Sequence, residues 1–273
     1  MHSDRHGILF VVQQHTNIMK ITPIKRRSSR SLLLVTLGAA MSLTLGLSAA
    51  RADLLFSDSF DYSEGPLVGN GPPPGSPPGQ TGWHPRGGDP QVYLPGLHLH
   101  GVYSAGAAAS FMDEYTDGDK AEAGLLRVNS GIVWIGFLVR ERSGDSSGWA
   151  VLNPGIQFGP GYGLIATRGT YGIDNDTGSA DDQAATDIAP SATPVWLVVK
   201  LNFHTGTQDL WVNPSNAGNE PDARAPDASL LMTPEFQASG FIQVVFNDGY
   251  NNGVFEFDEL RIGTKFNDIR TGQ

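Results

Sequence analysis

Residues 195–203 read VWLVVKLNF, and this stretch decides the fold because every second position is apolar. A period of two is typical of a β-strand with one face against a hydrophobic core. The predicted core face carries Val195, Leu197, Val199, Leu201 and Phe203. The other face carries Trp196, Val198, Lys200 and Asn202, of which Trp196, Lys200 and Asn202 are the candidate ligand-binding residues. We predict that these three residues line an open sheet face that binds a ligand.

The chain after residue 52 continues this pattern, with almost no helical periodicity. Short apolar runs alternate with Gly, Pro, Asn and Asp, which is typical of all-β proteins. Residues 132–140, IVWIGFLVR, are apolar on both faces and predict a central strand. About ten short strands in roughly 220 residues predict an all-β fold, a two-sheet antiparallel β-sandwich of the jelly-roll type. The other predicted strands are 54–60, 97–103, 107–112, 148–152, 162–167, 207–213, 241–247 and 254–262.

The N-terminal region predicts export. Residues 25–30 form a basic run, and residues 31–50 carry no charge and many Leu and Ala residues. Ala50-Arg51-Ala52 then supplies a small-residue cleavage pattern. This order is typical of a Sec-type secretory signal peptide. A membrane anchor is the alternative, since the apolar stretch approaches the length of a span.

The predicted domain organisation follows from that cleavage pattern. Residues 1–52 are interpreted as the signal peptide and residues 53–273 as a single jelly-roll domain. Because Met19 is a more natural start than Met1, residues 1–18 are interpreted as an over-extended start. The chain ends directly after the last predicted strand, so we expect no C-terminal anchor and a secreted or periplasmic location.

Charge and cysteine content exclude several classes of function. Residues 1–52 hold seven of the 18 Lys and Arg and one of the 28 Asp and Glu residues. The remaining chain has 11 basic and 27 acidic residues and a formal charge of −16. This charge opposes binding to nucleic acid or to an anionic membrane. The absence of cysteine excludes disulfides, thiolate metal sites and a cysteine nucleophile.

An ordered set of short motifs carries a resemblance to a known family. The motifs are LLFSDSFDYSEGPLVG (54–69), GW (82–83), GLHLHGVYSAG (96–106), IGFLVR (135–140), WLVVKLNF (196–203), DLWVNP (209–214), EPDA (220–223) and FDELRIGTKFNDI (257–269). This set resembles exported bacterial proteins of the planctomycete and verrucomicrobia type, with a concanavalin A-like or laminin-G-like (LamG-like) jelly-roll domain. The resemblance implies that fold. It implies no single activity, because the wider fold includes lectins, glucanases and lyases.

Two carboxylates near the C-terminus are candidate catalytic residues. In GVFEFDELRIG (253–263), Glu256 and Asp258 match the first two positions of E-x-D-x-E or E-x-D-x-x-E, the patterns that resemblance to retaining glucanases of this fold would require. The third position falls at Leu260 or Arg261, neither of which can protonate a leaving oxygen. The catalytic set is therefore incomplete.

The same stretch has a structural interpretation. A regular closing strand would place Asp258, Leu260 and Ile262 on one face. Leu260 and Ile262 would then lie in the core. Asp258 would stand at the start of the strand and accept backbone hydrogen bonds.

Two groups of residues are candidate metal ligands. His98 and His100 are spaced to point the same way from a strand, so both imidazoles can reach one transition metal. His84 or His204 would supply a third ligand, and the alternative is a pair of exposed edge histidines. The acidic loop 174–187 suggests Ca²⁺, which prefers six to eight oxygen ligands, although it lacks the EF-hand spacing. The calcium candidates are Asp174, Asp176, Asp181, Asp182 and Asp187.

Tryptophan side chains are candidate sugar platforms. Most tryptophans of a sandwich lie in the core, but Trp196 alternates with polar residues and Trp149 follows a Ser/Gly-rich turn. The sequence therefore predicts a secreted, non-catalytic protein that binds carbohydrate, a polysaccharide, or another extracellular polymer. The alternatives are a glycoside hydrolase or lyase, a His-coordinated metalloenzyme, and a structural surface or matrix protein.

Overall fold

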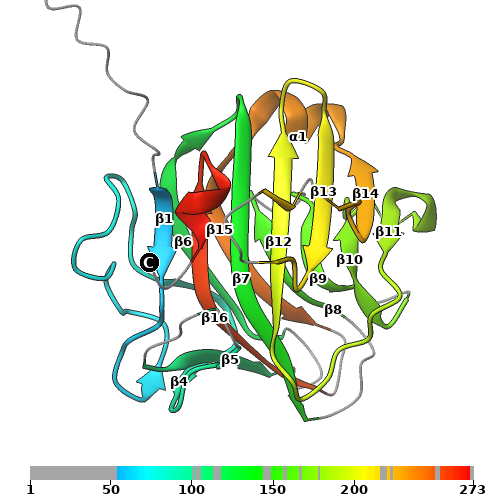
Figure 1. Ribbon diagram of the computed structural model, residues 1–273. Helices are drawn as coiled ribbons and strands as arrows, with labels where there is room; N and C mark the ends of the chain where they lie inside the picture. The colour runs from blue at the N-terminus through cyan, green and yellow to red at the C-terminus, as the bar shows by residue number, and fades with distance from the viewer. Residues whose placement is uncertain are drawn as a thin grey trace, which may run out of the picture. The chain divides into compact units, whose positions relative to one another are not determined.

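The computed structural model describes most of the chain after residue 53, and all of the described residues lie within one compact unit, Leu47–Gln273. The described residues are 54–99, 102, 106–112, 118–143, 149–155, 159–165, 168–177, 179–215, 220–221, 224–249 and 253–270. The predicted signal peptide and His100 lie outside them. Within this part of the chain two antiparallel β-sheets pack face to face, which confirms the predicted β-sandwich (Figure 1).

The first sheet has nine described strands. Its order is β14–β13–β12–β7–β16–β5–β4–β2, and β1 also pairs with β16. The strands are β1 (Leu54–Asp58), β2 (Gly65–Pro66), β4 (Gln91–Tyr93), β5 (Ala108–Met112), β7 (Ile132–Ser143), β12 (Val195–Asn202), β13 (Thr207–Val212), β14 (Ala228–Leu231) and β16 (Val254–Gly263).

The second sheet has seven described strands in the order β11–β10–β9–β8–β15–β6–β3. They are β3 (His84–Gly87), β6 (Lys120–Val128), β8 (Trp149–Pro154), β9 (Gly161–Ile165), β10 (Thr170–Asp174), β11 (Gln183–Ala185) and β15 (Phe241–Gly249). Three short helices complete the described structure, namely η1 (Ala180–Asp182), α1 (Pro234–Ser239) and η3 (Phe266–Ile269). None of the described helices has the length and apolar character needed to cross a membrane.

Strand β12 has the alternation that its sequence predicts. Its predicted core face is buried between the two sheets. The neighbouring β7 pairs with β12 on one side and with β16 on the other, which confirms it as a central strand. Strands β7 and β12 lie in the middle of the nine-stranded sheet, and both faces of each strand are covered.

A buried carboxylate organises the aromatic core. Asp58 is 2% exposed and accepts hydrogen bonds from Trp83 Nε1 (2.8 Å), Tyr62 Oη (2.7 Å) and Phe60 N (2.8 Å). The indole of Trp83 stacks on Phe246, with ring centroids 5.6 Å apart. Burial raises the pKa of Asp58 despite these three donors. The carboxylate thus fixes β1 and the loop after it against the core.

Leu260 and Ile262 of β16 lie in the core as predicted, but the predicted placing of Asp258 on their face is wrong, because a β-bulge interrupts the strand. Glu259 has φ 50°, and the register with β7 shifts between Asp258 and Arg261. Before the bulge β16 pairs with β5, and after it β16 pairs with β1. The extra residue moves Leu260 and Ile262 to the core face while Asp258 stays on the opposite face.

The sequence did not predict several of the described strands, of which β6 is the longest. Its core face carries the small residues Ala121 and Ala123, so the apolar signal is weak. Conversely, the predicted strand at 97–103 contributes only an isolated bridge between Leu99 and Val102 among the described residues.

Candidate functional site

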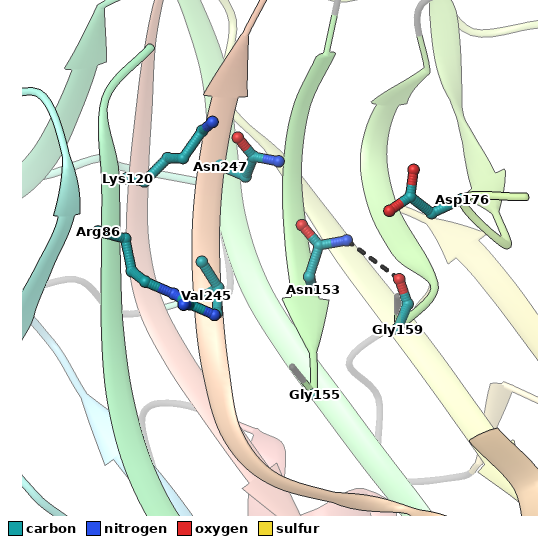
Figure 2. Close-up of a pocket in the computed structure, with 8 residues that line it drawn as sticks. All are labelled: Arg86, Lys120, Asn153, Gly155, Gly159, Asp176, Val245 and Asn247. Atoms are coloured by element: carbon teal, nitrogen blue, oxygen red, sulfur yellow. Dashed lines mark hydrogen bonds between the residues drawn. The ribbon is translucent and has the colours of Figure 1, made fainter. Parts of the chain in front are cut away.

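A groove lies on the outer face of the seven-stranded sheet, along β8 and its partner β15. Trp149, Val151 and Asn153 point into it from β8, because Ala150 and Leu152 face the core. From β15, Val245, Asn247 and Gly249 point the same way, because Val244 and Phe246 face the core. Figure 2 shows Asn153 and Asn247 on these adjacent strands, with Val245 further along β15.

The groove consists of three cavities in a row, with volumes of about 90, 230 and 200 Å³. The first two share Lys120, Asn153, Asp176 and Asn247, and the second and third share Gly155 and Gly159. From Trp149 to Gly155 an extended chain advances about 20 Å. The groove is therefore long enough for an extended ligand.

A glycine keeps the groove open. A Cβ atom at Gly161 of β9 would lie 3.2 Å from both Asn153 Nδ2 and Val151 Cγ2, which are groove residues. Asn153 is held from the same side, since its Nδ2 donates to Gly159 O at 3.3 Å. Any larger side chain at position 161 would occupy the space beside Asn153.

The β3–β6 side of the groove is basic. Arg86 Nε forms an ion pair with Glu122 Oε2 at 2.7 Å, and Gln243 Nε2 donates to the same oxygen at 2.9 Å. Lys120 stands two residues from Glu122 on the same face of β6 and lines two of the cavities. The side chain of Lys120 has no hydrogen bond or ion pair with any other described residue.

The β10 side of the groove is acidic. Asp174 is 5% exposed, and its Oδ2 accepts from Gln183 Nε2 (2.8 Å) and from Trp149 Nε1 (3.3 Å). Its Oδ1 accepts from the backbone N–H of Asp176 at 2.8 Å. Desolvation, together with the charge of Asp174, raises the pKa of Asp176. Figure 2 places Asp176 across the groove from Lys120 and Arg86.

The floor of the groove holds an unsatisfied acceptor. Asn247 Oδ1 is buried and accepts no hydrogen bond from the residues that the structure describes. A buried polar atom without a partner costs about 1–3 kcal/mol, so such atoms normally bind water or a ligand. The described protein atoms thus leave the hydrogen bonding of this groove residue incomplete.

The sheet face around Trp196 is not open, and that prediction is wrong. Trp196 is 1% exposed and packs on Phe266 of η3, with ring centroids 5.9 Å apart. Lys200 lies over the ring of Trp134, its Nζ 5.0 Å from the centroid. Asn202 Oδ1 accepts from two backbone N–H groups in the turn that follows β12. These side chains therefore have structural partners.

A second small core explains this burial. Residues of η3, together with Leu97, Leu99 and Val102, cover the outer face of the nine-stranded sheet. The cluster contains Leu97, Val102, Ala108, Trp134, Leu138, Trp196, Val198, Trp211, Phe266 and Ile269. Trp149, by contrast, is partly exposed and lies in the groove, where its predicted role as a sugar platform stays a prediction.

The candidate catalytic carboxylates lie outside the groove, on the other sheet. Glu256 is 3% exposed and forms ion pairs with Arg140 Nε and with Arg142 Nη1, the latter at 3.4 Å. Asp258 is fully buried, and its Oδ2 accepts from Leu97 N at 2.8 Å. Asp258 thus accepts backbone hydrogen bonds as predicted, but from the middle of β16.

The predicted calcium site does not assemble among the described residues. No group of three or more His, Asp or Glu side chains converges there. Asp174 directs its carboxylate toward N–H donors, and Asp181 and Asp182 lie on η1, where Asp182 accepts from Thr177 Oγ1. His98 is exposed, and the placement of His100 lies outside the described residues.

Sequence reasoning missed most of the groove. Lys120 lies on the unpredicted strand β6, and Asn153 falls just past the predicted end of β8. The available signal was the alternation WAVLN at 149–153, which places Trp149 and Asn153 on one face. Asn247 comes from a strand almost one hundred residues away, so its proximity to Asn153 is a tertiary property.

Comparisons with known proteins give partial structural likeness only. No protein-family model and no curated protein matches the chain. One similar solved structure is the binding domain of botulinum neurotoxin DC in complex with SialylT, 13% identical with a TM-score of 0.47, covering 76% of this chain and 49% of that chain. Another is cellulose induced protein, Cip1, 13% identical with a TM-score of 0.43, covering 66% of this chain and 88% of that one.

A third similar structure is a botulinum neurotoxin type C chain whose cell entry is described as dependent on two ganglioside molecules. It is 10% identical with a TM-score of 0.42, covering 65% of this chain and 43% of that chain. This protein thus spans less than half the length of either neurotoxin chain. What those proteins bind does not transfer to this chain at such low similarity.

Proposed function

We propose that this protein is a secreted, non-catalytic carbohydrate-binding β-sandwich, and that the groove along β8 and β15 holds an extended polysaccharide segment. The observation that carries the proposal is the combination of Trp149, the amides of Asn153 and Asn247, and charged side chains along one groove. Sugars offer hydroxyl groups that donate and accept, together with apolar ring faces that pack on aromatic rings.

The length of the groove favours a polymer over a single sugar. The three cavities share lining residues and follow β8 from Trp149 to Gly155. The unsatisfied Asn247 Oδ1 lies near the middle of this path, between the charged sides. A hydroxylated chain lying along the strand would satisfy Asn247 and contact Trp149 at the same time.

The placement of carboxylates favours binding over hydrolysis. The two carboxylates that line the groove, Asp174 and Asp176, both lie on its β10 side, whereas the described charged residues lining the opposite side are Arg86 and Lys120. Glycosidases that use two carboxylates hold them about 5–9.5 Å apart across the scissile bond. Among the described residues the groove therefore has no carboxylates on opposite sides of a bound chain, as an acid and a base or nucleophile would require.

A glycan array with the purified protein tests the proposal. We expect retention of at least one polysaccharide class, and loss of that retention in a Trp149→Ala, Asn247→Ala double variant. Tyr93→Ala is the matched aromatic control, because Tyr93 is exposed on the other sheet. Retention of no glycan, or retention that survives the double variant, would overturn the proposal. Release of reducing ends from a retained glycan would overturn its non-catalytic part.

A further inference from the structure

Two unpaired charges face one another across the middle of the groove. Lys120 and Asp176 each line both of the adjoining cavities, and Figure 2 shows them on opposite sides with Asn153 and Asn247 between them. Neither side chain forms an ion pair or hydrogen bond with another residue in the described part of the chain. A ligand at this place therefore meets a cationic donor on one side and a carboxylate acceptor on the other.

We propose that the groove selects a polysaccharide whose sugar units carry a carboxylate, as in a polyuronate, with that carboxylate bound by Lys120 and a sugar hydroxyl bound by Asp176. This inference rests on the proposed function, because it names the substrate class of the same groove. It follows from the chemistry of the two sides: an ammonium group binds an anion most strongly, while a carboxylate can only accept from a donor.

The neighbours of Lys120 leave its charge available. Glu122, the nearest carboxylate on its strand, is already bound by Arg86 and by Gln243. The charged residues that line the cavities on the β3–β6 side, Arg86 and Lys120, are both cationic. Arg86 uses its Nε for Glu122, which leaves its terminal amino groups as further donors to a bound anion.

Asp176 disfavours anionic groups of a ligand on its own side of the groove. Its own side of the groove includes the buried Asp174, so a second anionic group placed there would meet two carboxylates. A polymer with sulfate groups on every side of each sugar would therefore fit poorly. A uronate unit fits, because its carboxylate stands on one side of the ring and its hydroxyls on the other.

The negative charge of the chain determines how polyuronate binding should depend on salt concentration. A formal charge of −16 after residue 52 repels a polyanion at long range. At about 0.15 M ionic strength the Debye length is ~8 Å, so distant charges are screened while a direct Lys120 contact persists. We therefore expect polyuronate binding at physiological salt that does not strengthen as salt is removed.

The test compares polyuronates with their own neutral forms at about 0.15 M salt. Polygalacturonate, polymannuronate and the methyl ester of each are titrated into the wild-type protein. We expect at least one acid form to bind about tenfold more tightly than its ester, as a charge-assisted hydrogen bond implies. We expect Lys120→Gln to weaken binding of the acid form more than binding of the ester, and so to remove that preference. Arg168→Gln is the charge control, since Arg168 is exposed in the β9–β10 turn and lines none of the three cavities.

Asp176 provides a second, independent variant. We expect Asp176→Asn to improve binding of dextran sulfate at least severalfold, while Asp187→Asn, an exposed control, leaves it unchanged. Asn tolerates the left-handed backbone of residue 176, where φ is 55°, so the variant should fold. Far-UV circular dichroism of every variant checks that expectation.

The outcomes separate this inference from the proposed function. Equal affinity for acid and ester, or a preference that survives Lys120→Gln, overturns the inference and leaves carbohydrate binding in place. Retention of neutral glycans with no binding of either polyuronate likewise overturns the inference and leaves carbohydrate binding in place. Failure to retain any glycan overturns both.

Discussion

Trp149 Nε1 donates a hydrogen bond to Asp174 Oδ2 at 3.3 Å. This contact joins the first residue of β8 to the last residue of β10, across β9. Asp174, which the sequence suggests as a calcium ligand, instead anchors the aromatic side chain that the sequence suggests as a sugar platform. The orientation of the indole in the groove therefore depends on a buried carboxylate.

Replacing Trp149 by Ala should lower the affinity for a retained glycan about tenfold, because the aromatic face is removed from the groove. Trp149→Phe should have a smaller effect, because it keeps a ring but loses the N–H donor to Asp174. Isothermal titration calorimetry with the wild type and both variants measures the change. Unchanged affinity of Trp149→Ala would show that the ligand lies elsewhere.

Filling the groove at Gly161 should block binding, at some cost in stability because a Cβ atom there already lies 3.2 Å from Val151 Cγ2 and Asn153 Nδ2. A Val side chain there would extend past the positions of Val151 and Asn153 into the space of the ligand. We expect Gly161→Val to reduce glycan retention at least tenfold, and Gly161→Ala to reduce it less. Gly71→Ala is the control, because a Cβ atom at Gly71 meets nothing within 4 Å. Full retention by Gly161→Val would contradict the position of the groove.

Asp58 should contribute a pH-dependent part of the stability. Burial raises the pKa of Asp58 above its unfolded value of about 3.9, so the native state binds the proton more tightly than the unfolded chain does. The stability gained from the neutral carboxyl is fully present below the unfolded pKa and is lost as pH rises through the folded pKa.

Urea unfolding between about pH 3.5 and 7 measures this contribution. The free energy of unfolding of wild type minus that of Asp58→Asn should be largest at the acid end and should fall toward neutral pH. Asp61→Asn, at an exposed neighbour, should show no such trend. A difference that grows with pH would mean that the hydrogen bonds from Tyr62, Trp83 and Phe60 outweigh desolvation.

Glu256→Gln should lower stability by about 1–2 kcal/mol and leave glycan binding unchanged. The carboxylate is 3% exposed and balances Arg140 and Arg142, so its removal leaves two guanidinium groups without their shared anion. Urea unfolding and glycan retention are measured together, with the exposed Glu220→Gln as control. Loss of binding at full stability would return Glu256 to the list of functional residues.

The sequence predicted the strands of the nine-stranded sheet better than the strands of the seven-stranded sheet, on whose outer face the groove lies. In β12 the alternation identified the core residues correctly, because one set of side chains must leave water. The same pattern could not tell that Trp196 is covered, since Phe266 comes from a helix some seventy residues later. An amphipathic sheet face can be open or covered, and only the packing of distant segments decides which.

The sequence pattern also failed to predict the backbone conformation of one residue, Glu259. A regular strand would keep Asp258 on the face of Leu260 and Ile262, but Glu259 at φ 50° inserts an extra residue between them. The sequence EFDEL does not predict a residue in the left-handed conformation, because Glu has no preference for it. The bulge arises where β16 exchanges its partner β5 for β1, which is a property of the whole sheet.

The sequence by itself determined the class of fold, since a period of two in hydrophobicity allows only strands with a buried face. It also singled out Trp149. The tertiary structure decided which tryptophan is accessible and which side chains meet in the groove. Lys120, Asn153, Asp176 and Asn247 come from separate strands and loops and become neighbours through the pairing of β6, β15, β8, β9 and β10. A binding surface built across strands depends on that pairing, and no local pattern contains it.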